Sequence, residues 1–201
     1  MSNHNPCEEV TSAELDERSA KPIFRELVET LRLAAVAHAS ALSGIELFRD
    51  RIMASVAHAP DPAASLSSDF ILGVGPPEES GSIAYSQIPI AEIPMLMRDG
   101  GPIATQISQQ WAVTVHAEWD EHYRDRLTAA LGEPEKLAWP PFGDLRHLRN
   151  DIVHNRGRAS AERLRRLNVF THWFGVGEPI FFDTRKVAEF MTAVNAEVWK
   201  V

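Results

Sequence analysis

Residues 102–131 read PIATQISQQWAVTVHAEWDEHYRDRLTAAL, and this stretch carries the clearest helical pattern in the chain. Side chains four residues apart lie on the same face of an α-helix. The pattern therefore predicts a long helix that ends near Leu131, with aromatic residues in the protein core rather than stacked on nucleic-acid bases. The apolar residues that recur at steps of four are Ile103, Ile107, Trp111, Val115, Trp119 and Tyr123.

Helical spacing also marks the segments on both sides of this stretch. Residues 22–58 predict one long helix, or two helices with a break near Gly44. A further helix should begin at the Trp-Pro-Pro sequence of residues 139–141 and end at Gly157, and two more should follow the capping residues Ser160 and Thr184. We therefore expect a mainly α fold, namely an up-and-down bundle of four to five helices.

Residues 60–98 break the helical pattern, because they contain six prolines and three glycines. Two short apolar runs, 70–74 and 83–90, flank the turn sequence GPPEESG. This arrangement is typical of a small β-hairpin-like insertion that packs against the helices. We interpret residues 1–20, which are polar and acidic, as a flexible tail or a late-starting helix. Residues 21–201 then form a single domain with the insertion.

Composition limits the cellular setting. The 201 residues are 44% hydrophobic and 24% charged, as in ordinary folded proteins. An acidic N-terminus argues against a secretory signal, and one cysteine, Cys7, excludes an internal disulfide, so we expect a cytoplasmic protein. No run of about 18 apolar residues stands out, so we expect no membrane-spanning helix. With a formal net charge of −8, nucleic-acid binding requires a local basic patch.

Such a patch lies between Arg146 and Arg166, where seven arginines accompany only two acidic residues. The guanidinium fork suits phosphate groups better than a lysine does. A solvated basic helix, or a face that forms salt bridges between subunits, is the alternative interpretation.

The same segment predicts a helix with one polar face. Its apolar residues Leu145, Leu148 and Ile152 should point to the core. We expect the polar face to meet solvent or a partner, because its residues follow the spacing i, i+3, i+4 and i+7. These residues are His147, Asn150, Asp151 and His154.

The sequence Arg149-Asn150-x-x-x-His154 resembles the signature of the HEPN superfamily, helical domains found in many toxin and defence ribonucleases. The wider stretch from Leu148 to Gly157 is similar to the prokaryotic form of that signature. The resemblance implies a metal-independent endoribonuclease of toxin or antiviral-defence type that needs no cofactor. It also implies that two protomers join their signatures at the interface of a homodimer.

The resemblance gives each signature residue a role. His154 would move a proton to or from the ribose 2′-OH or the leaving oxygen, and Arg149 would stabilise charge on the scissile phosphate. Asn150 would orient the signature. Cleavage would then leave a 2′,3′-cyclic phosphate and a 5′-OH end.

The positions of four neighbouring residues favour contacts with RNA phosphates. This second inference rests on position alone and not on the signature. The partners that we expect are RNA, a second copy of the chain, and a neutralising antitoxin or regulatory protein. The four flanking residues are Arg146, His147, Arg156 and Arg158.

Other functions compete with this hypothesis. The chain could be a catalytically inactive dimerising module that binds RNA or a protein, with His154 only stabilising a helix end. A metal site is a third hypothesis, although the neighbouring arginines would repel a cation. Cys7 has no nearby base, and no glycine-rich phosphate loop is present. The candidate metal ligands are His147, Asp151 and His154, together with His116, Asp120 or His122.

Overall fold

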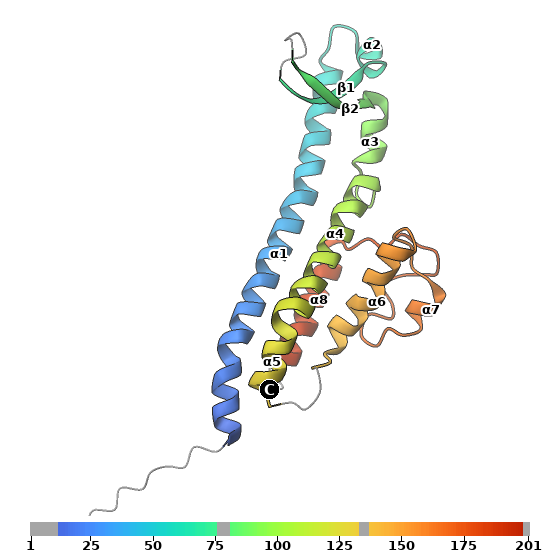
Figure 1. Ribbon diagram of the computed structural model, residues 1–201. Coiled ribbons are helices and arrows are strands. Elements are labelled where there is room, and N and C mark those ends of the chain that lie inside the picture. The colour runs from blue at the N-terminus through green and yellow to red at the C-terminus, as the bar shows by residue number, and fades with distance from the viewer. Residues whose placement is uncertain (1–11, 76–80, 133–136, 199–201) are drawn as a thin grey trace, which may run out of the picture. The chain divides into compact units, whose positions relative to one another are not determined.

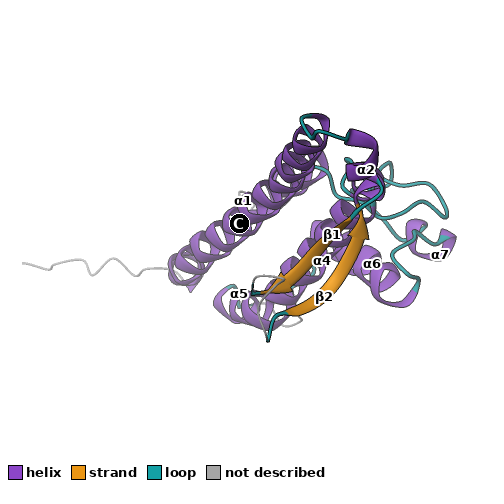
Figure 2. Cartoon of the chain, turned by 90° about the horizontal axis from the view of Figure 1, so that it is seen from above, coloured by secondary structure: helices purple, strands orange, loops and turns teal. Residues whose placement is uncertain are grey.

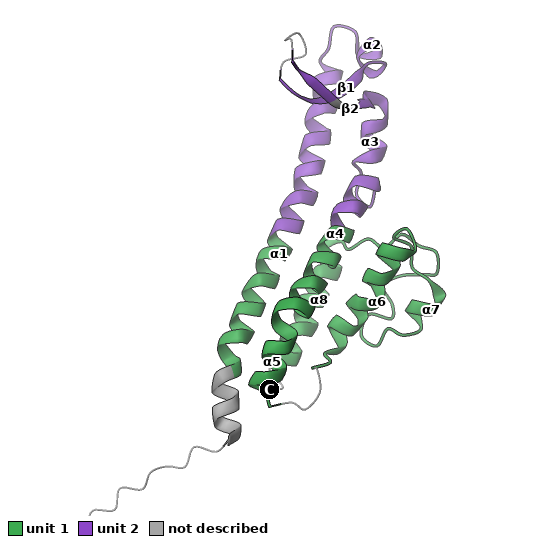
Figure 3. Ribbon diagram, in the orientation of Figure 1, with its two compact units in different colours: residues 1–36, 109–201 green, residues 37–108 purple. Residues whose placement is uncertain are grey.

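The computed structural model describes residues 12–75, 81–132 and 137–198, and Cys7 and residues 1–11 of the predicted tail lie outside this description. The described chain is mainly helical with one small two-stranded sheet (Figure 1). This confirms the predicted mainly α fold with a small β insertion. The chain divides into two compact units, residues 1–36 with 109–201 and residues 37–108 (Figure 3).

Helix α1 (Ser12–Ala57) is continuous, so of the two predicted alternatives the single long helix is present. It starts before Lys21, where the apolar pattern begins. Gly44 is exposed and does not interrupt it, because a single glycine costs a helix only about 1 kcal/mol relative to alanine. In the first unit, Phe24, Leu27 and Leu31 of α1 are buried in the core.

One part of α1 concerns the expectation about membranes. The stretch Ala20–Ala57 is long and apolar enough, by length and composition, to cross a membrane. This finding bears on the expectation that the chain has no membrane-spanning helix, but length and composition alone do not overturn it. Helices in the cores of soluble proteins and signal sequences pass the same test.

The second unit contains the predicted insertion. Helix α2 (Pro62–Leu66), strands β1 (Asp69–Val74) and β2 (Ile83–Pro89), a 3-10 turn (Ile90–Glu92) and helix α3 (Ile93–Leu96) follow one another. The strands form an antiparallel hairpin with an irregularity after Leu72 (Figure 2). Phe70 of β1 packs edge-on against Phe48 of α1, with 5.4 Å between ring centroids, so the hairpin packs on a helix as expected.

The stretch 102–131 forms three consecutive helical segments. Helix α4 (Pro102–Glu118) runs into a π-helical turn (Trp119–Tyr123) and then into α5 (Arg124–Ala130). Successive four-residue steps drift by about 40° around a regular α-helix, and the wider π-helical turn offsets this drift. The predicted core stripe is confirmed from Trp111 through Val115 and Trp119 to Tyr123, which are buried, whereas Ile103 and Ile107 are only half-buried.

The C-terminal part of the first unit holds α6 (Pro140–His154), α7 (Ala161–Leu164) and α8 (Thr184–Val198). Phe190 of α8 packs edge-on against Trp111 of α4, at 5.7 Å between centroids. The predicted Ser160 cap is confirmed, since its Oγ accepts a hydrogen bond from the backbone N–H of Arg163. The predicted Thr184 cap was wrong: the Oδ1 of Asp183 caps α8 by accepting the N–H of Lys186.

Candidate functional site

Helix α6 carries the Arg-Asn-x-x-x-His signature, and aromatic packing fixes its first turn. The Trp139 ring stacks against Trp119 at 5.2 Å and against Phe24 at 5.7 Å between centroids. Leu145 and Leu148, farther along α6, are fully buried, as predicted. The helix is therefore held against the core of the first unit along one face.

The three signature side chains remain accessible. Arg149 and Asn150 are half-buried, and Nη1 of Arg149 donates a 3.3 Å hydrogen bond to Oδ1 of Asn150. His154 is exposed in the last turn of α6. Five residues of α-helix correspond to a net rotation of about 140°, so Arg149 and His154 of one chain leave the helix in different directions. Among the described residues, no hydrogen bond joins the two.

The backbone that follows His154 is held in an unusual conformation. Arg156 and Gly157 have φ angles of 52° and 69°, in the left-handed region. Gln109 of α4 donates hydrogen bonds from Nε2 to the carbonyl oxygens of Gly157, at 3.2 Å, and Ile180, at 3.1 Å. A Cβ atom on Gly157 would overlap the Gln109 amide. The end of α6 is thus fixed to α4, and the signature has a defined end.

Two aspartates of α6 are buried, and one of them, Asp151, corrects the prediction of an exposed polar face. Asp144 is fully buried, and its carboxylate accepts the backbone N–H groups of Asn168, Val169 and Phe170. Asp151 is also buried, and its Oδ2 accepts the N–H of Ser160 at 2.6 Å. A buried carboxylate is stable only when hydrogen bonds satisfy it. These two residues therefore fasten the loops around α7 to α6.

The metal hypothesis gains no support from this arrangement. Asp151, its central carboxylate, is engaged with the backbone of Ser160. Among residues 12–75, 81–132 and 137–198, no group of three or more histidine, cysteine, aspartate or glutamate side chains is placed to hold a metal ion.

The arginines of the patch form an accessible basic surface. Arg146, Arg156, Arg158 and Arg165 are exposed, and Arg163 is half-buried. Within the described part of the chain, the seven arginines make a single ion pair, from Arg166 to Glu162 at 2.9 Å. Arg158 also donates to the carbonyl oxygen of Gly177. Most of these guanidinium groups therefore remain available to an anionic partner.

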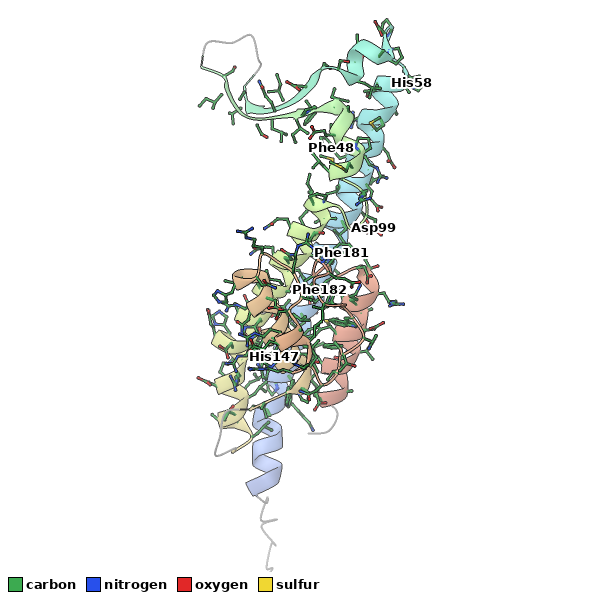
Figure 4. The ribbon with its side chains drawn as sticks, turned by 90° about the vertical axis from the view of Figure 1, so that its right-hand side faces the viewer. Phe48, His58, Asp99, His147, Phe181 and Phe182 are labelled. Carbon is green, nitrogen blue, oxygen red and sulfur yellow. The ribbon has the colours of Figure 1, made fainter. Side chains whose placement is uncertain are left out.

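His147 lies on α6, in the lower part of the view in Figure 4. Burial lowers its pKa, and the positive charges of Arg163 and Arg166 lower it further. Its Nδ1 is buried without a hydrogen-bond partner among the described atoms. His147 is therefore a neutral imidazole at pH 7 and a weaker candidate for direct phosphate contact than its sequence position predicts.

His116 of α4 is a residue whose setting the sequence did not reveal. Burial lowers its pKa, and the nearby charges of Arg149 and Arg146 lower it further, against the opposing effect of Asp120. The fold thus brings a second histidine close to the arginine of the signature. The sequence offers only one signal for this, namely that His116 adjoins the buried stripe at Val115.

No protein-family model, curated protein or solved structure matches the chain.

Proposed function

We propose that this protein is a metal-independent endoribonuclease of HEPN type that acts as a homodimer in the cytoplasm. One observation carries the proposal. Arg149, Asn150 and His154 remain accessible on α6, whereas the acidic neighbours Asp144 and Asp151 are turned inward and hold the backbone. A surface on which arginine side chains are accessible while the neighbouring carboxylates are buried suits a phosphodiester substrate.

The chemistry follows from the side chains. The His154 imidazole is exposed and takes the proton of the ribose 2′-OH or donates one to the leaving 5′ oxygen. The Arg149 guanidinium stabilises the negative charge that builds up on the phosphate, and its bond to Asn150 restrains its position. Attack of the 2′ oxygen on phosphorus breaks the bond to the 5′ oxygen and leaves a 2′,3′-cyclic phosphate.

A second copy of the chain is part of this proposal. Arg149 and His154 are about 140° apart around α6, which favours a site that takes its arginine from one chain and its histidine from another. Two copies related by a two-fold axis place the arginine of one chain opposite the histidine of the other.

RNA binding without cleavage is the second candidate function. The observation that favours it is the set of exposed arginines that form no ion pair within the described ranges, because these bind phosphate whether or not His154 is in position. An antitoxin or regulatory protein that covers this surface would control either function.

Cleavage of a defined RNA separates the two functions. We expect wild-type protein to generate 2′,3′-cyclic phosphate ends with a chelator present, and we expect Arg149→Ala and His154→Ala each to lose at least about a hundredfold in rate. Arg98→Ala and His122→Ala are the matched controls, since both side chains are exposed and outside the signature.

The outcome is decisive in each direction. Retained cleavage in either signature variant contradicts the assigned roles. RNA binding with no product from the wild type favours the second function, and loss of activity with the chelator favours a metal-dependent mechanism.

A further inference from the structure

A cavity of about 270 Å³ opens between the π-helical turn and the start of α6. It lies wholly within the first unit and does not include Arg149, Asn150 or His154. Its polar wall contains His116, Asp120, Arg124 and Arg146, and its apolar wall includes Leu137 and Trp139.

The π-helical turn builds one side of this cavity. Trp119 and Asp120 of the turn line it, and His116 lies one turn earlier on α4. A π-helical turn costs regular hydrogen bonding, and such turns are found frequently at functional sites. The widened backbone gives Asp120 and Arg124 their places at the rim of the cavity.

Among the described residues, Arg146 is the cation in the cavity that has no ion-pair partner. Arg124 is already engaged, because it donates to Oδ1 of Asp120 at 3.0 Å and to the carbonyl oxygen of Leu137 at 2.9 Å. Arg146 is exposed and makes no ion pair within the described residues. The cavity therefore contains the Asp120–Arg124 pair, the Arg146 guanidinium and the His116 imidazole, whose protonated form a bound anion would stabilise.

We propose that this cavity binds one phosphate-bearing nucleotide, with its phosphate held by Arg146 and His116. The apolar side chain of Leu137, next to the buried ring of Trp139, suits the base. The volume is at the small end of ligand cavities, which favours one nucleotide rather than a longer strand in the cavity. An arginine fork supplies the charge-assisted hydrogen bonds that a phosphate requires.

This inference goes beyond the proposed ribonuclease, since it concerns residues outside the signature and holds if the protein cleaves nothing. The nucleotide is either free in solution or one unit of an RNA strand whose neighbours cross the basic surface. Both sources present the same phosphate and base to the cavity.

The test is calorimetric titration of the full chain with AMP, adenosine and inorganic phosphate. We expect saturable AMP binding, with adenosine weaker by about tenfold or more because it lacks the charge that Arg146 meets. AMP should also shift the His116 ring resonance in the NMR spectrum. AMP that binds no better than adenosine overturns the proposal.

Two variants with matched controls locate the site. Arg146→Ala removes the arginine proposed to hold the phosphate, and Arg165→Ala removes an exposed arginine that does not line the cavity. Gly143→Leu adds a side chain at a glycine of α6 that lines the cavity, and nothing lies within 4 Å of its missing Cβ. Gly44→Leu makes the same substitution at an equally open glycine of α1 outside the cavity. Leucine is a good helix former, so both glycine variants should fold, as thermal melting will verify.

We expect Arg146→Ala and Gly143→Leu each to weaken AMP binding by about tenfold, and the two controls to change it by less than about twofold. Equal losses in test and control variants overturn the proposal. A short oligoadenylate that displaces AMP identifies RNA as the source, whereas AMP binding alone identifies a free nucleotide. RNA cleavage by His154→Ala is measured in a separate assay. A negative result for the ribonuclease hypothesis is therefore distinguishable from a negative result for AMP binding in the cavity.

Discussion

The carboxylate of Asp151 accepts a 2.6 Å hydrogen bond from the backbone N–H of Ser160, the residue that caps α7. This bond joins the helix of the signature to the segment that carries Arg156 and Arg158. The conformation of the basic surface therefore depends on a buried acid.

Replacing Asp151 by alanine leaves a half-buried N–H without an acceptor. We expect Asp151→Ala to lower the free energy of unfolding by about 1–3 kcal/mol, as is usual for an unsatisfied buried group. Urea unfolding measures this, with Asp99→Ala as a control at an exposed site. A loss no larger than that of the control would show that the bond adds nothing to stability.

Gly157 tests the connection between α6 and α4. Its left-handed φ of 69° disfavours alanine by about 1–2 kcal/mol, and overlap with the Gln109 amide adds to this cost. Gly177→Ala is the matched control, because its φ of 80° is similar and nothing lies within 4 Å of its missing Cβ. We expect Gly157→Ala to destabilise more than Gly177→Ala in urea unfolding. The excess should shrink in a Gln109→Ala background, and an excess that persists there would exclude the overlap as its cause.

Local periodicity was enough to predict most helices and the hairpin. The apolar residues Trp111, Val115 and Trp119 recur every four positions, and the turn sequence lies between β1 and β2. Both signals involve residues that are close together in the sequence. The π-helical turn escaped prediction because a four-residue step fits both kinds of helix closely enough over one or two turns.

The candidate site was harder to predict, because long-range backbone contacts decide it. The positions of Asp144 and Asp151 in the sequence fit an exposed polar face. Both carboxylates are nevertheless buried, because they accept hydrogen bonds from backbone N–H groups 9 to 26 residues away in sequence. His116 likewise approaches Arg149 only through the packing of α4 on α6. No local pattern contains these contacts.

The histidine beside the signature arginine makes stability depend on pH. The pKa of His116 is lowered in the folded protein by burial and by Arg149, Arg146 and Arg124, although Asp120 opposes them. The unfolded chain then binds a proton at higher pH than the folded chain, so stability falls as pH drops below about 6.5 and levels off below the folded pKa.

We expect His116→Gln to flatten this part of the stability curve, measured by urea unfolding between pH 7.5 and pH 5. His147 has a pKa lowered in the same direction, so the double variant with His147→Gln should be flatter still. An exposed-site variant, His122→Gln, serves as the control. A His116→Gln curve that parallels the wild type would contradict the role of His116.

The basic surface predicts how RNA binding responds to salt. The slope of log affinity against log salt concentration decreases by about 0.7 to 0.9 for each phosphate contact removed. We therefore expect Arg146→Ala and Arg165→Ala, each in a His154→Ala background, to reduce the slope for single-stranded RNA by about this amount. Arg98→Ala, outside the patch, should leave it unchanged. Equal slopes in all variants would place RNA elsewhere on the protein.

The directions in which Arg149 and His154 leave α6 predict complementation between subunits. In a dimer of one Arg149→Ala chain and one His154→Ala chain, one arginine–histidine pair across the interface is intact. An isolated mixed dimer keeps one of its two arginine–histidine pairs, so it should cleave at about half of the wild-type rate, whereas each variant alone remains inactive. The measurement is the cleavage rate of the co-expressed pair after its mixed dimers are isolated with two affinity tags. Mixed dimers without activity would show that one phosphate does not take its arginine from one chain and its histidine from the other.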